Sequence, residues 1–174
     1  MTAAAKPKLY RDLARQLAAL IAGEPDLIAN TANMAALIYY GLPDLNWAGF
    51  YFRNGAELVL GPFQGKPAYV RIPIGKGVCG TSAARGAALL VPDVHDFPGH
   101  IACDPESRSE LVVPLVENGS VLGVLDLDSS LPARFDEKDR EGCEQLVELL
   151  LVHHRKYPPG SLRRNFDDRT SNRR

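Results

Sequence analysis

The 174-residue sequence is poor in cysteine, with only three, and these follow no Cys-x-x-Cys pattern. An odd number of cysteines without paired spacing argues against the disulfide framework of a small secreted domain. The lack of Cys-x-x-Cys pairs also argues against a structural zinc site and against a thioredoxin-type motif. We therefore expect free thiols with a packing or redox role, and no structural metal site.

Long apolar runs are also missing. No stretch is long enough to span a membrane, and the amino end lacks the pattern of a signal peptide. The apolar content of 45% and the charged content of 24% are ordinary for a globular protein. Since 174 residues are enough for one domain with a real core and few for two, we expect a single cytoplasmic domain without membrane contact.

The sequence lacks an excess of either charge, because its formal net charge is −1. This balance hides an asymmetry: from Arg155 onward there are seven Lys or Arg and two Asp or Glu, out of totals of 20 and 21. Residues 158–174 hold one aromatic residue, Phe166, so a nucleic-acid-binding arm is disfavoured. We predict a folded domain over residues 1–157 and a basic, disordered tail over residues 158–174.

Helical periodicity is present at both ends of the predicted domain. Apolar residues recur at helical spacing over residues 9–21, and a second helix is expected over residues 26–41. A long helix is expected over residues 136–157, where Pro158 and Pro159 end it. A short helix from Thr81 to Arg85 is expected to end at Gly86.

Between the terminal helices the pattern is that of strands. Aromatic and β-branched runs flank a turn at Asn54-Gly55, and a second hairpin surrounds Asn118-Gly119. Two further strands are expected over residues 68–74 and 88–93. The order of elements predicts a single α+β domain, with an antiparallel sheet of about five or six strands. Helices are expected on one face of this sheet, and loops that form a pocket on the other.

The segment over residues 93–110 fits neither period, and we predict a long ordered loop. Loops of this length in a compact domain are usually functional. The loop contains Cys103, where a polar environment favours a nucleophilic or redox role over packing. Cys79 lies in the small-residue run GVCGTSA, where an inert buried thiol and a reactive one are both open. Cys143 falls on the apolar stripe of the last helix and is predicted to lie in the core.

Two carboxylates two residues apart, Asp126 and Asp128, are expected to leave one face of their strand, and Glu110 opens the strand that pairs with it. Such carboxylates repel one another and are costly to bury without a partner. A metal ion and the ammonium group of a small ligand would both supply the missing charge, although the ligand loops of familiar hard-cation sites are absent. A carboxyl group that kept its proton would serve as a general acid, and solvent exposure at the strand end is the alternative.

The aromatic residues gather on the first predicted strand. Trp47 and Tyr51 are four residues apart and share one face, while Phe50 and Phe52 share the other. One pair is expected to pack in the core. The other either does the same or forms the wall of a small-molecule pocket.

Six segments, taken in order, carry a resemblance to a known family. They are NWAGFYF, LVLGPFQGKPA, RIPIGKGVCGT, DVHDFPGHIACD, SELVVPL and GVLDLDS, and they span the chain from Asn46 towards its last helix. With them the chain resembles the free methionine-(R)-sulfoxide reductases, which consist of a single GAF-type domain. The resemblance implies a thiol-dependent oxidoreductase without a bound cofactor, whose substrate is free methionine sulfoxide and whose electrons come from thioredoxin and ultimately from NADPH.

The resemblance also implies roles for individual residues. By motif position Cys103 is the nucleophile and Cys79 the thiol that resolves its sulfenic acid, while Glu110 or Asp128 polarises the departing oxygen. The substrate pocket would be lined by Trp47, Tyr51, Asp93 and Asp126, of which Asp126, with Asp93, receives the substrate ammonium.

The chain departs from the family pattern at one position. Family members commonly carry a further cysteine ten residues before the GVCG cysteine, and Tyr69 stands there in this chain. Recycling would then depend on Cys79 or on direct attack of an external thiol on Cys103. The alternatives to the reductase are a non-catalytic GAF-type module that binds a small molecule and a thiol redox sensor. The sequence is also compatible with a homodimer.

Overall fold

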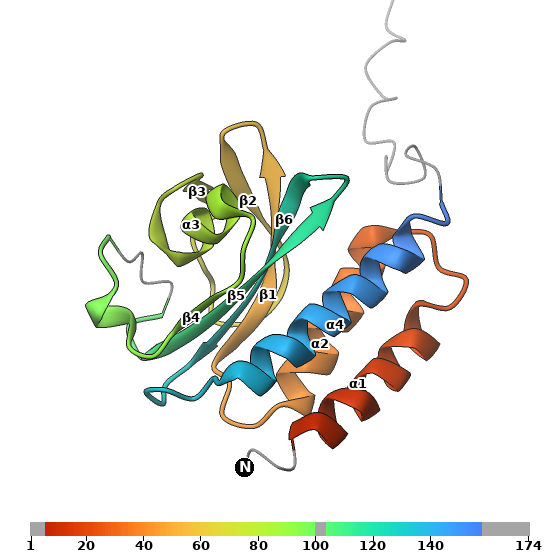
Figure 1. The fold of residues 1–174 in the computed structure, drawn as a ribbon, viewed down its shortest axis with the longest axis horizontal. Coiled ribbons are helices and arrows are strands. Elements are labelled where there is room, and N and C mark those ends of the chain that lie inside the picture. Colours follow the sequence, from red (N-terminus) through yellow and green to blue (C-terminus); the bar gives the residue numbers. More distant parts are fainter. Residues whose placement is uncertain (1–5, 100–103, 158–174) are drawn as a thin grey trace, which may run out of the picture.

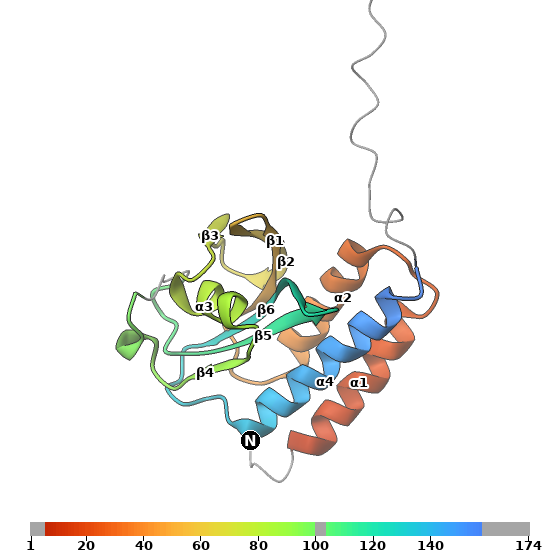
Figure 2. The same ribbon diagram turned by 45° about the horizontal axis from the view of Figure 1, so that its top comes forward.

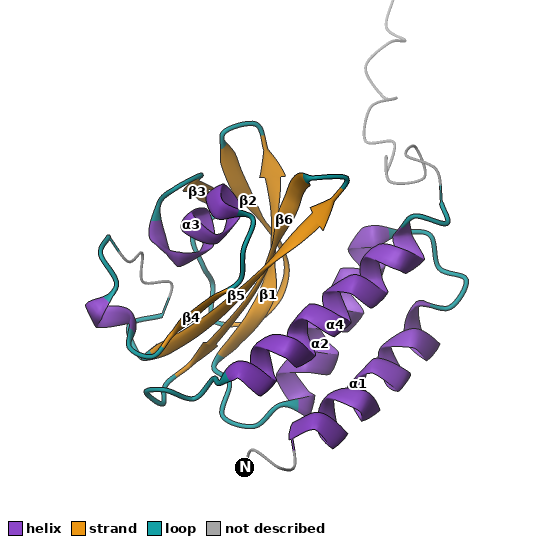
Figure 3. Ribbon diagram, in the orientation of Figure 1, coloured by secondary structure: helices purple, strands orange, loops and turns teal. Residues whose placement is uncertain are grey.

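The computed structural model describes residues 6–99 and 104–157. The predicted tail over residues 158–174 and the predicted nucleophile Cys103 lie outside these residues. The described elements form one six-stranded antiparallel sheet and four α-helices (Figures 1 and 3). The predicted α+β architecture is confirmed.

The helices at the two ends of the domain lie where the sequence predicted them, and α2 and α4 begin with side-chain caps. Helix α1 covers Lys6–Ile21 and helix α2 covers Leu27–Gly41, where Asp26 accepts a hydrogen bond from the amide of Ala29. Helix α4 covers Glu137–His154 and starts with a capping box between Asp136 and Asp139.

The sheet has the order β3-β2-β1-β6-β5-β4. Its strands are β1 (Trp47–Asn54), β2 (Glu57–Gly65), β3 (Arg71–Pro73), β4 (Leu89–Val91), β5 (Ser109–Glu117) and β6 (Ser120–Ser129). The β5–β6 turn places Asn118 and Gly119 at positive φ, as a tight hairpin requires. In the β1–β2 hairpin, Asn54 pairs with Glu57, so the turn residues are Gly55 and Ala56.

Two expected elements differ in extent from the structure. The strand expected over residues 68–74 is shorter, because only Arg71–Pro73 pairs as β3 with β2. The helix expected from Thr81 begins four residues earlier, since α3 covers Gly77–Arg85 and ends at Gly86 in the left-handed region. The loop between β4 and β5 contains one turn of 3-10 helix, η1 (Val94–Asp96).

The sheet separates two buried clusters. Helices α1, α2 and α4 cover one face and enclose the larger core, which includes Phe50, Leu125 and Cys143. Helix α3 lies over the opposite face (Figure 2), where loops alone were expected, and packs on a smaller cluster that includes Cys79, Trp47 and Tyr51. The alternation of side chains along β1 therefore sends one aromatic pair to each face.

Candidate active site

Three buried carboxylates meet on the α3 face of the sheet. Asp126 and Asp128 alternate with the core residues Leu125 and Leu127 along β6, so both point away from the helical layer. Glu110 on β5 pairs with Asp128 in the ladder between the two strands. All three are at most 5% exposed, which rules out the alternative that they end in solvent.

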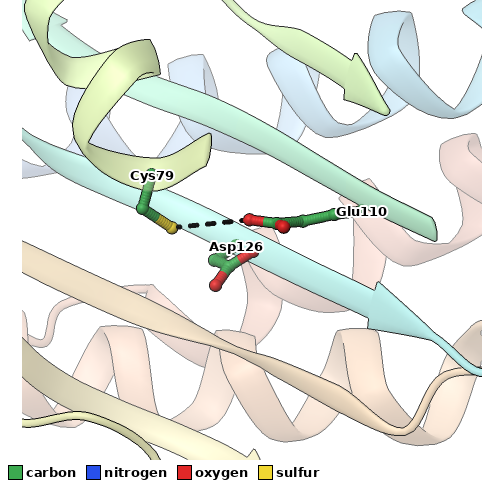
Figure 4. Close-up of side chains that lie close together, drawn as sticks. All are labelled: Cys79, Glu110 and Asp126. Carbon is green, nitrogen blue, oxygen red and sulfur yellow. Dashed lines mark hydrogen bonds between the residues drawn. The ribbon is translucent and has the colours of Figure 1, made fainter. Parts of the chain in front are cut away.

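Cys79 approaches these carboxylates from above the sheet. Helix α3 presents its thiol, which donates a hydrogen bond to Glu110 Oε1 at an S···O distance of 3.8 Å (Figure 4). The Cys79 sulfur and one carboxylate oxygen each from Glu110 and Asp126 all lie within 4.8 Å of one another. Cys79 is only 4% exposed and is a free thiol. Of the two alternatives left open for Cys79, an inert packing role is disfavoured, because its buried thiol contacts the carboxylates of Glu110 and Asp126.

Burial changes the ionisation of the cluster. It raises the pKa of Asp126 from 3.8 to about 6, and it holds the pKa of Asp128 well above its ordinary value, with the Asp126 charge adding to the effect. Burial also raises the pKa of the Cys79 thiol well above 9.0, and the charges of Asp126 and Glu110 raise it further. Asp126 is therefore mostly ionised at neutral pH, Cys79 keeps its proton, and Asp128 holds its proton to a higher pH than an ordinary aspartate does.

The charge on Asp126 is incompletely compensated. Its buried Oδ1 atom has no hydrogen-bond partner within the described part of the chain. Across residues 6–99 and 104–157, no Lys or Arg side chain forms an ion pair with Asp126 or Asp128. A buried carboxylate oxygen without a partner is costly, so this position suits a cationic group of a ligand.

Trp47 and Tyr51 form an aromatic wall beside the carboxylates. Trp47 pairs with Asp128 across β1 and β6, and its ring stacks on Tyr51 and on Phe63 at centroid distances of 5.9 and 5.4 Å. Its indole Nε1 donates to the carbonyl of Lys66, which fixes the ring plane. Gly49 makes room for this arrangement, because a Cβ atom there would lie 2.6 Å from the indole ring. The predicted shared face of Trp47 and Tyr51 is confirmed.

Asp93 lies outside the three-residue cluster. Arg108 donates a 2.6 Å hydrogen bond to its Oδ2 atom, and His95 contacts Oδ1 through both its backbone amide and its ring. The Arg108 guanidinium, followed by the His95 contacts, holds the pKa of Asp93 well below its ordinary value. Asp93 thus has a cationic partner in Arg108, whereas Asp126 forms no ion pair with a Lys or Arg of the described residues.

Comparison with known proteins decides the family. A family model for the GAF domain matches residues 26–153. The chain is 53% identical over 145 residues to the free methionine-R-sulfoxide reductase of Escherichia coli, an alignment that covers 83% of this chain and 88% of that protein. The chain belongs to the free methionine-R-sulfoxide reductase family of GAF domains.

Solved structures agree with this assignment. The free methionine-R-sulfoxide reductase of Neisseria meningitidis, solved in complex with its substrate, is 43% identical with a TM-score of 0.84, covering 89% of this chain and 93% of that one. A Burkholderia vietnamiensis protein described as a candidate GAF sensor is 57% identical with a TM-score of 0.83, covering 87% and 96% of the two chains. Both fold and family resemblance predicted from the sequence are confirmed.

The family model leaves helix α1 outside its match, although this helix packs on α4. Buried Lys6 on α1 forms ion pairs with Asp136 and Asp139 at the start of α4. Tyr10 donates to Asp139, and the thiol of Cys143 donates to the hydroxyl of Tyr10 at 3.7 Å. Cys143 is fully buried, which confirms its predicted place in the core of this reductase-family chain.

Tyr69, which the family resemblance places at the position of a further cysteine, is 55% exposed. Its carbonyl accepts a hydrogen bond from the hydroxyl of Tyr51, so the backbone there still contacts the aromatic wall. Within the described residues of this family member, Cys79 is thus the one thiol beside the carboxylates.

The sequence did not predict a polar network around Asp104, which directly follows residues 100–103 in the chain. Asp104 is 2% exposed and accepts hydrogen bonds from the Glu106 amide, the Lys66 ammonium and the Asn46 side chain. Asn46 also donates to Ser107, a residue that lowers the pKa of Asp128 by hydrogen bonding. The position of Asn46 beside Trp47 was visible in the sequence, but no spacing rule links it to residues about sixty positions later.

No α-helix among the described residues is long and apolar enough to cross a membrane.

Proposed function

We propose that this protein reduces free methionine (R)-S-oxide to methionine. The observation that carries the proposal is the cluster of Cys79, Glu110, Asp126 and Asp128, in which an ionised carboxylate, a carboxyl group of raised pKa and a thiol share one buried site. Family membership supports the same activity, since the Escherichia coli and Neisseria meningitidis relatives are free methionine-R-sulfoxide reductases.

Asp126 is proposed to receive the substrate ammonium. It is mostly ionised at neutral pH, and its Oδ1 atom has no partner in the described residues. An ammonium group would supply both the positive charge and the missing hydrogen bond. Asp93, which the sequence also suggested for binding the ammonium, is already paired with Arg108 and His95. We therefore assign it a weaker contribution to ammonium binding than Asp126.

Asp128 is proposed as the acid that polarises the departing oxygen. Burial holds the pKa of Asp128 well above its ordinary value, so this carboxyl group keeps its proton to a higher pH than an ordinary aspartate, as a general acid requires. Glu110 then holds the Cys79 thiol through its hydrogen bond. Trp47 and Tyr51 would pack on the apolar part of the substrate, including the S-methyl group.

Cys103 is proposed as the nucleophile. Its thiolate attacks the sulfoxide sulfur and forms an S–S bond, while two protons convert the oxygen into a departing water. Water then attacks the Cys103 sulfur, the S–S bond breaks with its electron pair leaving on methionine, and Cys103 ends as a sulfenic acid. The thiol of Cys79 then condenses with the sulfenic acid to a disulfide with loss of water. Because burial and neighbouring charges keep Cys79 protonated, this thiol is a poor initial nucleophile, in keeping with its assignment as the resolving residue.

A dithiol such as thioredoxin is the proposed reductant of this disulfide. Exchange through a mixed disulfide returns both cysteines to the thiol state, with electrons from NADPH by way of thioredoxin reductase. Such a cycle requires a reducing compartment, and the cytoplasm, where the sequence leads us to expect the protein, is one.

The test of substrate class compares free methionine (R)-sulfoxide with its N-acetyl derivative, using the purified protein, thioredoxin, thioredoxin reductase and NADPH. The proposal predicts turnover of the free amino acid and a loss of at least about a hundredfold in kcat/KM for the N-acetyl compound, which has no ammonium group. Equal turnover of both would overturn the role of Asp126. No turnover of either would favour a binding or sensing module.

A further inference from the structure

The same cluster offers a donor set for a metal ion. Cys79 supplies a thiol sulfur, and Glu110 and Asp126 supply carboxylate oxygens, all within 4.8 Å of one another. A tetrahedral zinc ion, with Zn–S of about 2.3 Å and Zn–O of about 2.1 Å, places its sulfur and oxygen ligands about 3.6 Å apart. The observed distance of 3.8 Å between Cys79 Sγ and Glu110 Oε1 is close to this separation.

Asp126 provides an independent sign that a cation belongs here. The residue is 3% exposed, and its Oδ1 atom has no hydrogen-bond partner in the described residues. Figure 4 shows its carboxyl group beside the Cys79–Glu110 hydrogen bond, on the side of the sheet from which the thiol approaches. A bound dication would pair this oxygen and bring the negative charge of the three ligands close to balance.

The three donors come from rigid elements. Cys79 is the third residue of α3, while Glu110 and Asp126 lie on the adjacent strands β5 and β6. The ligands of a metal site must be held near their final geometry for tight binding, and helix and strand positions do this better than loops. Thiolate ligands select zinc and related thiophilic ions over magnesium and calcium, which prefer oxygen donors.

We propose that Cys79, Glu110 and Asp126 form a binding site for a thiophilic divalent cation such as Zn²⁺, and that the cation and the amino-acid ligand exclude one another. On binding, the Cys79 thiol loses its proton to solvent, the cation coordinates the resulting thiolate and two carboxylates, and a fourth position stays open to water. No electron is transferred. The mutual exclusion rests on the proposed function, because the metal ion and the substrate ammonium would both bind the Asp126 carboxylate. The binding of metal itself does not depend on the proposed function.

Binding of Zn²⁺ would inhibit the reductase without unfolding the protein. Zn²⁺ would block the ammonium position and hold the resolving thiol as a ligand, so the reductase would stop while the metal stabilised the folded chain. The inhibition would be competitive with methionine sulfoxide and reversed by a chelator.

The experiment uses Co²⁺ as the probe, because a cobalt–thiolate bond gives a charge-transfer absorption band in the near ultraviolet. The reduced full-length protein is titrated with Co²⁺ without oxygen, and Zn²⁺ is then added to displace it. We expect a 1:1 band that Zn²⁺ removes, that Cys79→Ser abolishes and that Asp126→Asn weakens by at least about tenfold in affinity. Cys143→Ala and Asp12→Asn, which change a thiol and a carboxylate elsewhere, should leave the band unchanged.

Two results would overturn the site. The band could persist in Cys79→Ser, above all if Cys103→Ser removes it, or Asp126→Asn could bind Co²⁺ as tightly as the parent. Thermal melts of each variant establish that it is folded before its binding is scored. Addition of L-methionine to the cobalt-loaded protein should bleach the band, and a band that survives saturating methionine would refute the exclusion. If the protein binds Co²⁺ in this way but reduces no sulfoxide, the metal site is supported and the proposed function is refuted.

Discussion

Glu110 on β5 lies directly opposite Asp128 on β6, and both side chains are at most 5% exposed. Like charges in opposing positions of an antiparallel ladder destabilise it, and burial increases the cost. The raised pKa of Asp128 reflects this cost, since burial favours the neutral form of its carboxyl group, in which the repulsion is absent. The site is therefore maintained at the expense of stability, as is common where a fold holds groups for binding or chemistry.

Removal of a buried charge should stabilise the fold. The pKa of Asp126 rises from 3.8 in the unfolded chain to about 6 in the folded one, so its contribution to stability is present below pH 4 and is lost as the pH rises through 6. At about 1.4 kcal/mol per pKa unit, ionisation costs the folded state about 3 kcal/mol at pH 7. Asp126→Asn should therefore raise the free energy of unfolding at pH 7 by up to about 3 kcal/mol, measured by urea denaturation, and abolish methionine binding. A variant less stable than the parent at pH 7 and equal to it at pH 4 would contradict this account.

Trp47 should report ligand binding. It is the only tryptophan in the chain, it is 1% exposed, and it stacks beside the carboxylate cluster. L-methionine, which shares its ammonium group and thioether with the substrate, should change the intensity or wavelength of the Trp47 emission in a saturable titration. N-acetyl-methionine should have no effect, and Asp126→Asn should lose the response. An emission that no amino acid alters would show that ligands do not reach this wall.

The affinity for L-methionine should depend on pH in a defined direction. Asp126 must be ionised to pair with an ammonium group, and the pKa of its carboxyl in the free protein is about 6. The dissociation constant from the fluorescence titration should stay level above pH 7 and rise about tenfold between pH 7 and pH 5, as the carboxylate takes up a proton. A dissociation constant that falls as the pH is lowered would contradict the assignment of Asp126 as the ammonium partner.

The sequence predicted the elements well where periodicity was strong. Terminal helices, both hairpins, the core position of Cys143 and the shared face of Asp126 and Asp128 all follow from spacing along one or two neighbouring elements. The start of α3 was missed because Gly77 and Gly80, which are poor helix formers, lie in its first turn, where packing against the sheet overrides propensity.

Contacts between distant segments were beyond sequence reasoning. Nothing in the spacing of Cys79, Glu110 and Asp126 shows that helix α3 brings its thiol to 3.8 Å from the carboxylate on β5. The engagement of Asp93 by Arg108 depends likewise on the path of the loop between β4 and β5. Family motifs located these residues, but their contacts and their pKa shifts come from the fold.

The polar clamp between α1 and α4 should matter for stability and not for binding. Asp139 is fully buried and accepts hydrogen bonds from Lys6, Tyr10 and Arg134. Asp139→Asn leaves the buried Lys6 and Arg134 with less compensating charge and should lower the free energy of unfolding by about 3 kcal/mol. Its affinity for L-methionine should be unchanged at temperatures where it is folded.

The matched control for this clamp is Glu141→Gln on the same helix. Glu141 forms an exposed pair with Lys138, so its loss should change stability by less than about 0.5 kcal/mol. Equal effects of the two substitutions in urea denaturation would contradict the importance given to the buried clamp.

The most direct test of the central claim measures free methionine released from resolved (R) and (S) methionine sulfoxide, with thioredoxin, its reductase and NADPH. The parent protein should turn over the (R) form alone. Cys103→Ser should release none, and Cys79→Ser should release about one equivalent of methionine per chain and then stop, because its sulfenic acid has no internal thiol to condense with. Continued turnover by Cys103→Ser, or the absence of any methionine from the parent with either isomer, would contradict the account.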